Sequence, residues 1–528
     1  MLSKYFDKEF LLTLFILLIL LIEIIVLFVV LSFKAKQLTR EEYLAKAIEA
    51  YEWMMQFQIT PPGAPWGWHL NCREAWGGLV GYYTRHYKWA AVYCAESFYQ
   101  LYIASHDVGW FLELGVDLYN ITGEEKYLKA AELAAQWALR IQVGYSSWLK
   151  EFEKRYIMPR KTERSVSWRY VPGVKFSEKV IGAYTEGMFV FSGEPPFLHD
   201  WSKGVCYAEP ALWIAPEHVT PIAKGLLKLY LVTRNKTYLI SAIRALDFIA
   251  RMQSPEGGIY TCYPPNAYGI RMGDTASAAE LFLYAYVVTG NKTYLKRGLK
   301  ACDFMLSKQV AYGRWRGALP HLSTAGGSWR KYSYFTGDAA EAIIAWLKAY
   351  ELTEENKYLE AAVRAAYFIL RMQETDAGKP WGTKIYSWDK RAVGGFYWAY
   401  VPGYGILAYQ FISTTTSAAI ALLKLYSVVE EPIFLESVNL ALKWLLETEI
   451  YSPSSTYLDL PGLTVVSDPH GLYKSGYVPL YSKYYDEIPG TMTGDPEQGF
   501  CVAMATSGPC YLFLEIYRLY PKVYSQRK

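Results

Sequence analysis

The chain has 528 residues and nearly balanced charge, since 54 basic and 50 acidic side chains give a formal net charge of +4. This charge is too small to favour a nucleic-acid partner, which would need a strongly basic surface. The seven cysteines are scattered and odd in number, so their spacing defines neither a disulfide framework nor a zinc site. We expect neither a metal nor a cofactor.

The first element in the chain is a long apolar segment, residues 10–33, which only Thr13, Glu23 and Ser32 interrupt. As a helix it spans about 36 Å at ~1.5 Å per residue, enough to cross a bilayer. We predict a membrane anchor, which makes membrane lipid a partner of the chain. Glu23 lies near mid-span, where it is either a tolerated, protonated side chain or a contact with another membrane helix.

After the anchor, one helical signature recurs six times, with Tyr-Leu, an alanine, an aromatic residue and a glutamine at fixed spacing. The first copy reads Tyr43, Leu44, Ala50, Trp53 and Gln58, and the others begin at Tyr127, Tyr238, Tyr294, Tyr358 and Phe434, the last of which has Glu449 in place of the glutamine. Such self-similarity indicates one repeated supersecondary unit. Charges along one side of each copy predict a helix with one face in water.

Each of the last five copies follows a second helix that is apolar on almost every side and is therefore expected to be buried. We expect these inner helices to have about 12 to 16 residues, too few to cross a membrane. They close on Tyr119, Tyr230, Tyr286, Tyr350 and Tyr426. The turn that follows, for example Thr289-Gly290-Asn291, is short, so the two helices are antiparallel neighbours. In it, glycine or asparagine can take the left-handed conformation, and a polar residue can cap the next helix.

The two ends of the repeat complete each other. An outer helix at 41–58 has no inner partner, and an inner helix at about 509–520 has no outer partner. Pairing them closes a ring, so we predict an all-α fold, a six-hairpin (α/α) toroid with one N-terminal transmembrane helix. The predicted boundaries are a tail over 1–9, the anchor over 10–33, a linker over 34–40, the toroid over 41–520 and a tail over 521–528.

Connection lengths locate the working face of this ring. Inner-to-outer turns have a few residues, whereas the outer-to-inner connections 142–218, 373–414 and 449–505 are long. Long loops on a rigid scaffold are where sites are usually built. The residues that open the inner helices on this face, twelve before each closing tyrosine, are Asp107, His218, Asp274, Asp338, Thr414 and, in the last helix, Ala505.

These residues have two interpretations. An aspartate at a helix start is commonly a cap that accepts backbone N–H groups. As a set, however, Asp107, Asp274 and Asp338 with His218 place carboxylates and an imidazole around one opening, as general acid/base chemistry requires. Glu217, the neighbour of His218, adds another carboxylate.

Aromatic residues follow the outer-helix glutamines, as is typical of surfaces that bind sugar rings, although packing beneath the long loops explains them equally well. The candidate substrate-binding residues are Trp66, Trp68, Tyr260, Arg271, Trp315, Arg316 and Trp381. A basic stretch over 150–169 is either solvated or attracts anionic ligands such as uronates and sulfates.

The hairpin formed by Tyr286, Thr289-Gly290-Asn291, Tyr294-Leu295 and Ala301 resembles those of the six-hairpin glycosidase superfamily. It is also similar to the C-terminal domain of glucuronyl epimerases that invert carbon five, which are often single-pass membrane proteins. The resemblance covers about residues 41–520 and implies the toroid and a carbohydrate-active enzyme.

The resemblance does not assign catalytic residues. No tyrosine-arginine-histidine run matches the epimerases. Unsaturated-glucuronyl hydrolases imply only an acidic residue at an inner-helix start, which Asp107, Asp274 and Asp338 all satisfy. Terpenoid and lanthionine cyclases also form helical toroids, but their DDxxD, DxDD and Cys-His-Gly motifs are absent from this sequence.

The sequence thus predicts a membrane-anchored, glycoside hydrolase-like enzyme acting on an acidic oligo- or polysaccharide. Asp274 and Asp338 are the expected acid and base, and His218 with Glu217 is the expected orienting or proton-transferring pair. Two alternatives stay open. One is a uronate C5-epimerase or polysaccharide lyase, and the other is a non-catalytic glycan-binding or envelope assembly module.

The side of the membrane is predicted from weaker signals. Lysines and arginines flank the anchor almost equally and lean slightly toward a cytoplasmic toroid. Three glycosylation sequons, at Asn120, Asn235 and Asn291, fit the opposite side, although each lies in a turn where asparagine also has a backbone role. The expected chemistry suits the outside, so we predict an extracytoplasmic toroid.

Overall fold

The computed structural model describes residues 38–69, 71–83, 100–155, 178–192, 206–211, 213–265, 267–325, 327–385, 387, 392–407, 410–450, 472–473, 476–477 and 500–524. The predicted anchor over 10–33, Glu23 and most of the basic stretch lie outside these residues. The anchor and its partners therefore stay predictions.

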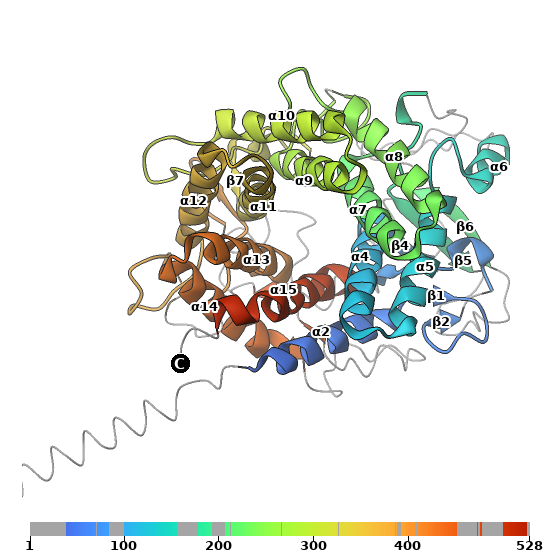
Figure 1. Cartoon of the computed structure of the whole chain (residues 1–528), viewed down its shortest axis with the longest axis horizontal. Coiled ribbons are helices and arrows are strands. Elements are labelled where there is room, and N and C mark those ends of the chain that lie inside the picture. Colours follow the sequence, from blue (N-terminus) through green and yellow to red (C-terminus); the bar gives the residue numbers. More distant parts are fainter. Residues whose placement is uncertain are drawn as a thin grey trace, which may run out of the picture.

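The described residues are mostly helical and form two concentric rings (Figure 1). The inner helices are α4 (Ser105–Thr122), α7 (Pro216–Thr233), α9 (Met272–Thr289), α11 (Thr336–Thr353), α13 (Ile412–Val429) and α15 (Val502–Val523). The outer helices are α5 (Glu125–Arg140), α8 (Lys236–Arg251), α10 (Lys292–Lys308), α12 (Asn356–Arg371), α14 (Pro432–Thr448) and α2 (Arg40–Met55). Each inner helix contacts the next around the ring, including α15 with α4. The fold is an α/α toroid, as predicted.

The first and last helices close the ring by packing as a hairpin. Arg40 of α2 donates from Nε to the carbonyl of Tyr517 (3.1 Å), and its guanidinium lies 4.1 Å from the centre of that tyrosine ring. Cys510 donates to the carbonyl of Ala47 at 3.3 Å. Residues more than 450 positions apart are therefore joined as the unpaired helices at the two ends of the repeat predict.

The hairpin turns repeat one hydrogen-bond arrangement. Asn235 and Asn291 accept from the backbone N–H two residues later, at 3.0 and 2.9 Å, so asparagine caps the outer helix. The left-handed residue precedes them and donates to the carbonyl of the closing tyrosine. It is Gly123, Gly290, Arg234, Glu354 or Glu430. The expected glycine or asparagine thus holds in two of five turns. In the other three turns, the capping hydrogen bond holds the backbone of an arginine or a glutamate in the left-handed conformation.

In the first five copies of the repeat, the glutamine ties the outer helix to the next one. Gln142 donates from Nε2 to the carbonyls of Ser241 on α8 and of Gly182 in its own loop, at 2.9 and 3.1 Å. The same pair of bonds forms at Gln253, Gln309 and Gln373. Gly182 has a φ of +93°, and a Cβ there would lie 2.2 Å from the carbonyl oxygen of Arg244. The close approach of loop and helix therefore requires glycine.

The long connections contain strands, which the all-α prediction omits. The largest sheet is antiparallel, in the order β14 (Phe500–Cys501), β3 (Val80–Tyr83), β4 (Gln100–Ala104), β5 (Gly187–Ser192), β6 (Cys206–Ala211). A second sheet joins β7 (Tyr334–Phe335), β8 (Ala399–Val401) and β9 (Gly405–Ile406). Strands β4, β7 and β14 run directly into α4, α11 and α15, so these sheets lie at the N-terminal ends of inner helices.

The remaining short elements complete the connections. They are β1 (Ile59–Thr60) with β2 (Trp68–His69), β10 (Gln410–Phe411) with β13 (Gly476–Tyr477), β11 (Glu449–Ile450) with β12 (Leu472–Tyr473), α6 (Ser147–Arg155), and the 3₁₀ turns η1 (Arg73–Ala75), η2 (Glu178–Val180) and η3 (Ser328–Tyr332).

The inner helices are longer than expected. Five of them have 18 residues, because each begins several residues before its apolar stretch. Among the described residues, α13 is long and apolar enough to cross a membrane by length and composition, so the expectation that no later segment qualifies is wrong. Its apolar window is 56% buried inside the protein, where α13 contacts α11 and α15, as a core helix does.

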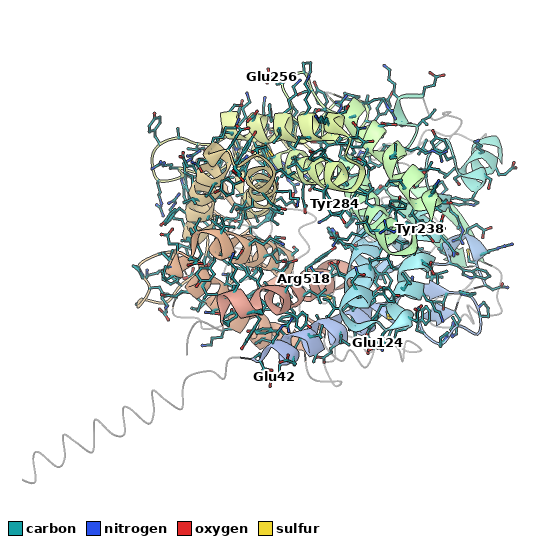
Figure 2. The ribbon with its side chains drawn as sticks, in the orientation of Figure 1. Glu42, Glu124, Tyr238, Glu256, Tyr284 and Arg518 are labelled. Atoms are coloured by element: carbon teal, nitrogen blue, oxygen red, sulfur yellow. The ribbon has the colours of Figure 1, made fainter. Side chains whose placement is uncertain are left out.

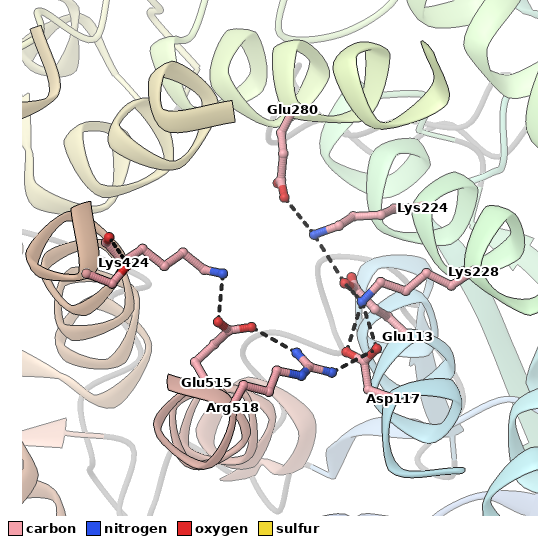
Figure 3. A network of polar contacts seen from close by, with 9 residues as sticks. Glu113, Asp117, Lys224, Lys228, Glu280, Lys424, Glu515 and Arg518 are labelled. Carbon is pink, nitrogen blue, oxygen red and sulfur yellow. Dashed lines mark hydrogen bonds and ion pairs between the residues drawn. The ribbon is translucent and has the colours of Figure 1, made fainter. Parts of the chain in front are cut away.

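The inner helices also carry charges toward the ring axis, and are not apolar all round as expected. Figure 2 shows Arg518 and Tyr284 at the central opening and Glu256 at the outer edge. Figure 3 shows the network of ion pairs that these charges form. In order, the pairs of this lumenal charge network are Glu280–Lys224 (2.9 Å), Lys224–Glu113 (3.1 Å), Glu113–Lys228 (2.7 Å), Lys228–Asp117 (2.8 Å), Asp117–Arg518 (3.1 Å), Arg518–Glu515 (2.9 Å) and Glu515–Lys424 (2.7 Å).

Candidate active site

The residues predicted to open the inner helices occupy equivalent positions. Asp107, His218, Asp274, Asp338 and Thr414 are each the third residue of their helix, and all five are buried. The fold therefore brings them to one end of the ring, opposite the short turns. Ala505 is the fourth residue of α15, and its side chain lies outside the described residues.

Arg271, the residue before α9, organises the centre of this group. Its Nη1 donates to Glu217 at 2.5 Å, and its Nη2 lies 3.2 Å from Asp274 Oδ1. A Cβ on Gly273 would lie 2.7 Å from Asp338 Oδ1 and 3.1 Å from the Glu341 carboxylate. Glycine at this position thus allows the carboxylates of α11 to approach the start of α9.

Asp338 has a histidine partner that the repeat pattern does not predict. His321, in the connection before α11, places Nδ1 2.7 Å from Asp338 Oδ2, and both side chains are buried. Glu341, one turn further along α11, accepts from Ser277 at 3.1 Å. We call Glu217, Arg271, Asp274, His321, Asp338 and Glu341 the loop-face cluster.

The capping interpretation does not describe Asp107 and Asp274. None of the four helices that begin near Asp107, His218, Asp274 and Asp338 has a side-chain hydrogen bond at its N-cap. Among the described residues, both carboxylate oxygens of Asp107 and of Asp274 are buried without a hydrogen-bond partner. The ion contact between Arg271 and Asp274 lacks the alignment of a hydrogen bond. Buried carboxylates in this condition are costly for folding and typical of functional sites.

Burial keeps protons on part of the cluster. It raises the pKa of Asp274 well above its usual range, against the attraction of Arg271 and with the help of the negative charges of Glu217, Glu341 and Asp338. Burial likewise raises the pKa of Glu341 to about 8, again opposed by Arg271. At neutral pH both carboxyls therefore hold a proton and can donate a hydrogen bond or the proton itself.

Glu217 behaves oppositely. Burial raises its pKa, but Arg271 and His218 outweigh burial and bring the pKa down to about 2. Burial lowers the pKa of His218 to about 4, against the attraction of Glu217. The site thus combines a permanent carboxylate, a neutral imidazole and protonated carboxyls around one guanidinium.

A second group of histidines adjoins the cluster. His106 and His218 face each other with Nδ1 atoms 3.4 Å apart, and His106 Nε2 lies 3.1 Å from Asp107 Oδ1. Trp110 and Trp213 pack edge-on against these imidazoles. Burial lowers the pKa of His106, only partly offset by Asp107, and raises the pKa of Asp107. Two imidazoles whose pKa values are lowered thus lie beside a buried carboxyl.

Most of the aromatic residues predicted to bind substrate pack against the outer helices and their loops. Trp66 and Trp381 donate from Nε1 to the repeat glutamines Gln58 and Gln373, at 2.9 and 3.1 Å. Trp315 packs against Tyr400 with ring centres 4.2 Å apart. These contacts account for the three tryptophans by packing, and their substrate-binding role stays a prediction.

The other residues predicted to bind substrate lie in different surroundings. Tyr260 is half-buried and pairs its backbone with Ile270. Arg316 is exposed, and no contact in the described part of the chain joins it to the loop-face cluster. The side chain of Trp68 lies outside the described residues. Of the predicted binding residues whose side chains the structure describes, Arg271 alone enters the cluster.

The residues that the sequence did not single out left weak signals. Glu341 is a lone carboxylate in a helix whose other residues from 339 to 350 are nearly all apolar, and that exception marks a functional or paired charge. His321 and the neighbouring Arg330 lie in a connection with no repeat pattern. Their approach to Asp338 depends on how the loop folds back.

The described residues contain no group of three or more His, Cys, Asp or Glu side chains arranged to hold a metal ion. The acid-rich cluster is neutralised in part by Arg271 and by its own protons. The predicted lack of metal and cofactor stays a prediction.

Solved structures share this architecture along almost the whole chain. A cellobiose 2-epimerase from Bacillus thermoamylovorans is similar with a TM-score of 0.57 and 11% identity, over 90% of this chain and 99% of that one. A sugar epimerase from a ruminal bacterium has a TM-score of 0.54 and 12% identity, over 90% and 98% of the two chains. An unsaturated glucuronyl hydrolase specific for heparin has a TM-score of 0.51 and 12% identity, over 92% and 98%.

No sequence-family model matches the chain, and no curated protein is similar enough in sequence to be a relative. At the identities above, the structural likeness establishes the fold alone. The chain has the six-hairpin glycosidase fold, which confirms the predicted resemblance at the level of architecture.

Proposed function

We propose that the chain is a carbohydrate-active enzyme that hydrolyses an acidic oligo- or polysaccharide by carboxylate acid/base chemistry. The observation that carries this proposal is the presence of two buried carboxyls with different surroundings at one end of the ring. Buried Asp274 holds a proton, while Asp338 accepts the hydrogen bond of His321 at the same end of the ring. A general acid and a general base are the two groups that glycosidic hydrolysis requires.

The two carboxyls have separate tasks. Asp274 donates its proton to the glycosidic oxygen as the bond between that oxygen and the anomeric carbon breaks. Asp338 accepts a proton from the water whose oxygen bonds to the anomeric carbon. His321 holds the carboxylate in place, and Arg271 with Glu217 fixes the position of Asp274. Proton exchange with solvent then restores both groups.

The experiment is turnover of a glycan panel by the full-length chain, followed as release of reducing ends. Asp274→Asn and Asp338→Asn should each lower turnover by roughly 10²-fold or more, because each removes a proton-transferring group. Glu256→Gln is the matched control, since Glu256 is an exposed acid at the outer edge (Figure 2). Turnover that survives both aspartate changes would refute these roles.

A second candidate is a sugar epimerase, and the paired neutral imidazoles of His106 and His218 favour it. Two neutral bases can remove and return a carbon-bound proton. Two of the similar structures above are sugar epimerases. Deuterium incorporation at a sugar carbon without chain cleavage, lost in His218→Gln, would select this activity over hydrolysis. Glycan binding that is unchanged in every variant, with no turnover, would instead favour a non-catalytic module.

A further inference from the structure

A second arginine, the half-buried Arg330, lies near the loop-face cluster in the connection before α11, where the charges of Glu217, Arg271 and Asp338 act on it. It belongs to the 3₁₀ turn η3, eight residues before Asp338. Its guanidinium carbon lies 5.2 Å from the ring centre of Trp329 and 5.4 Å from that of Trp398. The two indoles are 6.1 Å apart and inclined by 71°, so they form a corner that holds the cation.

Backbone bonds fix this corner beside the site. Leu322 donates to the carbonyl of Lys331 at 2.8 Å, and His321 donates to that of Ser333 at 3.0 Å, so η3 lies against the segment that carries His321. The ring of Phe335 packs on His321 at 4.5 Å and on Trp398 at 5.1 Å. One aromatic group therefore supports both the His321–Asp338 pair and Arg330.

Arg330 differs from Arg271 in having no acidic partner within ion-pair distance among the described residues. Its Nε is buried and makes no hydrogen bond within the described residues. Burial, reinforced by the charge of Arg271, lowers the pKa of Arg330, and the carboxylates of Glu217 and Asp338 only partly compensate. A buried donor of this kind is costly to the fold unless something binds it.

We infer that Arg330 is a specificity-determining residue that binds the carboxylate of a uronic acid unit in the substrate. The planar guanidinium fork matches a carboxylate in both shape and charge. The inference deepens the proposed function and rests on it, because it assigns the acidic group of the substrate to one side chain of the same site.

The test is calorimetric binding of methyl glucuronide and methyl glucoside, which differ only at carbon six, to the full-length chain. The wild type should bind the glucuronide more tightly. Arg330→Gln should weaken glucuronide binding by roughly 10- to 100-fold, the usual loss for a hydrogen bond to a charged group, and leave the glucoside unchanged. Arg314→Gln is the matched control, because Arg314 also lies over a tryptophan, 5.0 Å from the ring centre of Trp315, but is exposed.

Equal binding of the two sugars by the wild type, or binding of neither, would overturn the inference. An equal loss for both sugars in Arg330→Gln would do the same. If that variant does not fold, Arg330→Lys keeps the charge without the fork and should reduce the preference for the glucuronide only in part. Undiminished turnover in Asp274→Asn and Asp338→Asn, together with an Arg330-dependent preference, would reject the catalytic proposal while retaining the anion site.

Discussion

The two ends of the central opening carry charge in opposite ways. In the lumenal charge network, four acids alternate with four bases, and each charge has an oppositely charged neighbour within 3.1 Å (Figure 3). In the loop-face cluster, two of the four carboxyls, Glu217 and Asp274, contact the guanidinium of Arg271, and Arg330 forms no ion pair within the described residues. One end is electrostatically complete and the other is short of positive charge.

The pKa values follow this difference. Burial raises the pKa of Glu515, but Lys424 and Arg518 outweigh burial and lower it to about 2. Burial acts in the same direction on Glu341, where too little positive charge opposes it, and the pKa rises to about 8. Similar burial thus leaves Glu515 ionised in an ion pair at one end and Glu341 protonated at the other. We interpret the first as structural and the second as functional.

The largest expected effect comes from breaking the paired end. Glu113→Gln leaves Lys224 and Lys228 facing each other without the carboxylate between them. Removing one partner of a buried ion pair should cost about 3–5 kcal/mol of unfolding free energy. Denaturant unfolding of the wild type and the variant at pH 7 measures this loss. A change below about 1 kcal/mol, as for an exposed pair, would show that water screens the network.

The opposite end should respond in the opposite direction. Asp274→Asn replaces a buried carboxyl, protonated only at a cost in free energy, with a neutral side chain of the same shape. We expect this change to stabilise the fold by roughly 1–2 kcal/mol at pH 7 while turnover falls, because the site exchanges stability for function. The same unfolding measurement, paired with the turnover assay, checks both signs. Destabilisation would mean that the contact of Asp274 with Arg271 contributes more than the protonation costs.

Glu341 gives this contrast a pH dependence. Between its ordinary pKa of 4.5 and about 8, the unfolded carboxyl is ionised while the folded one keeps its proton. The folded state therefore binds more protons in this window, and its stability falls as pH rises from 4.5 to 8. In Glu341→Gln that contribution disappears, so the variant should gain roughly 1–3 kcal/mol over the wild type between pH 5 and pH 8. Unfolding free energies measured across this pH range check the prediction. A difference between the two proteins that stays constant from pH 5 to pH 8 would contradict a raised pKa.

The sequence predicts the scaffold well because every part of the repeat has a local physical cause. The tyrosine carbonyl accepts the capping bond, asparagine caps the outer helix, and Gln142 and its equivalents bind the next helix. Such short-range signals recur with the period of the hairpin. Counting along that period is enough to place the third residues of the inner helices at one end of the ring.

The chemistry of that end is harder to read from sequence. Asp274 and Arg271 are three residues apart and predictable, but His321 reaches Asp338 only through a fold-back of its loop. The charged stripe of the network escapes prediction for another reason. In an inner helix only the lumenal side is polar, so Glu113 and Lys224 are diluted among apolar residues and do not change the overall character of the helix.

The smallest expected effect tests whether a lysine stabilises the toroid through its ion pairs in the lumenal charge network or through its position on the inner helix. Lys348 is the thirteenth residue of α11, equivalent to Lys228 and Lys424. It nevertheless forms its ion pair with Glu351 of its own helix, and the Glu351 side chain is exposed. An exposed pair three residues apart contributes about 0.5 kcal/mol or less, so Lys348→Gln should leave the midpoint of unfolding nearly unchanged, whereas Lys228→Gln should lower it clearly. An equal decrease of the unfolding midpoint in the two variants would show that a lysine at this position stabilises the toroid regardless of its ion-pair partners. The stabilisation would then come from the position and not from the lumenal charge network.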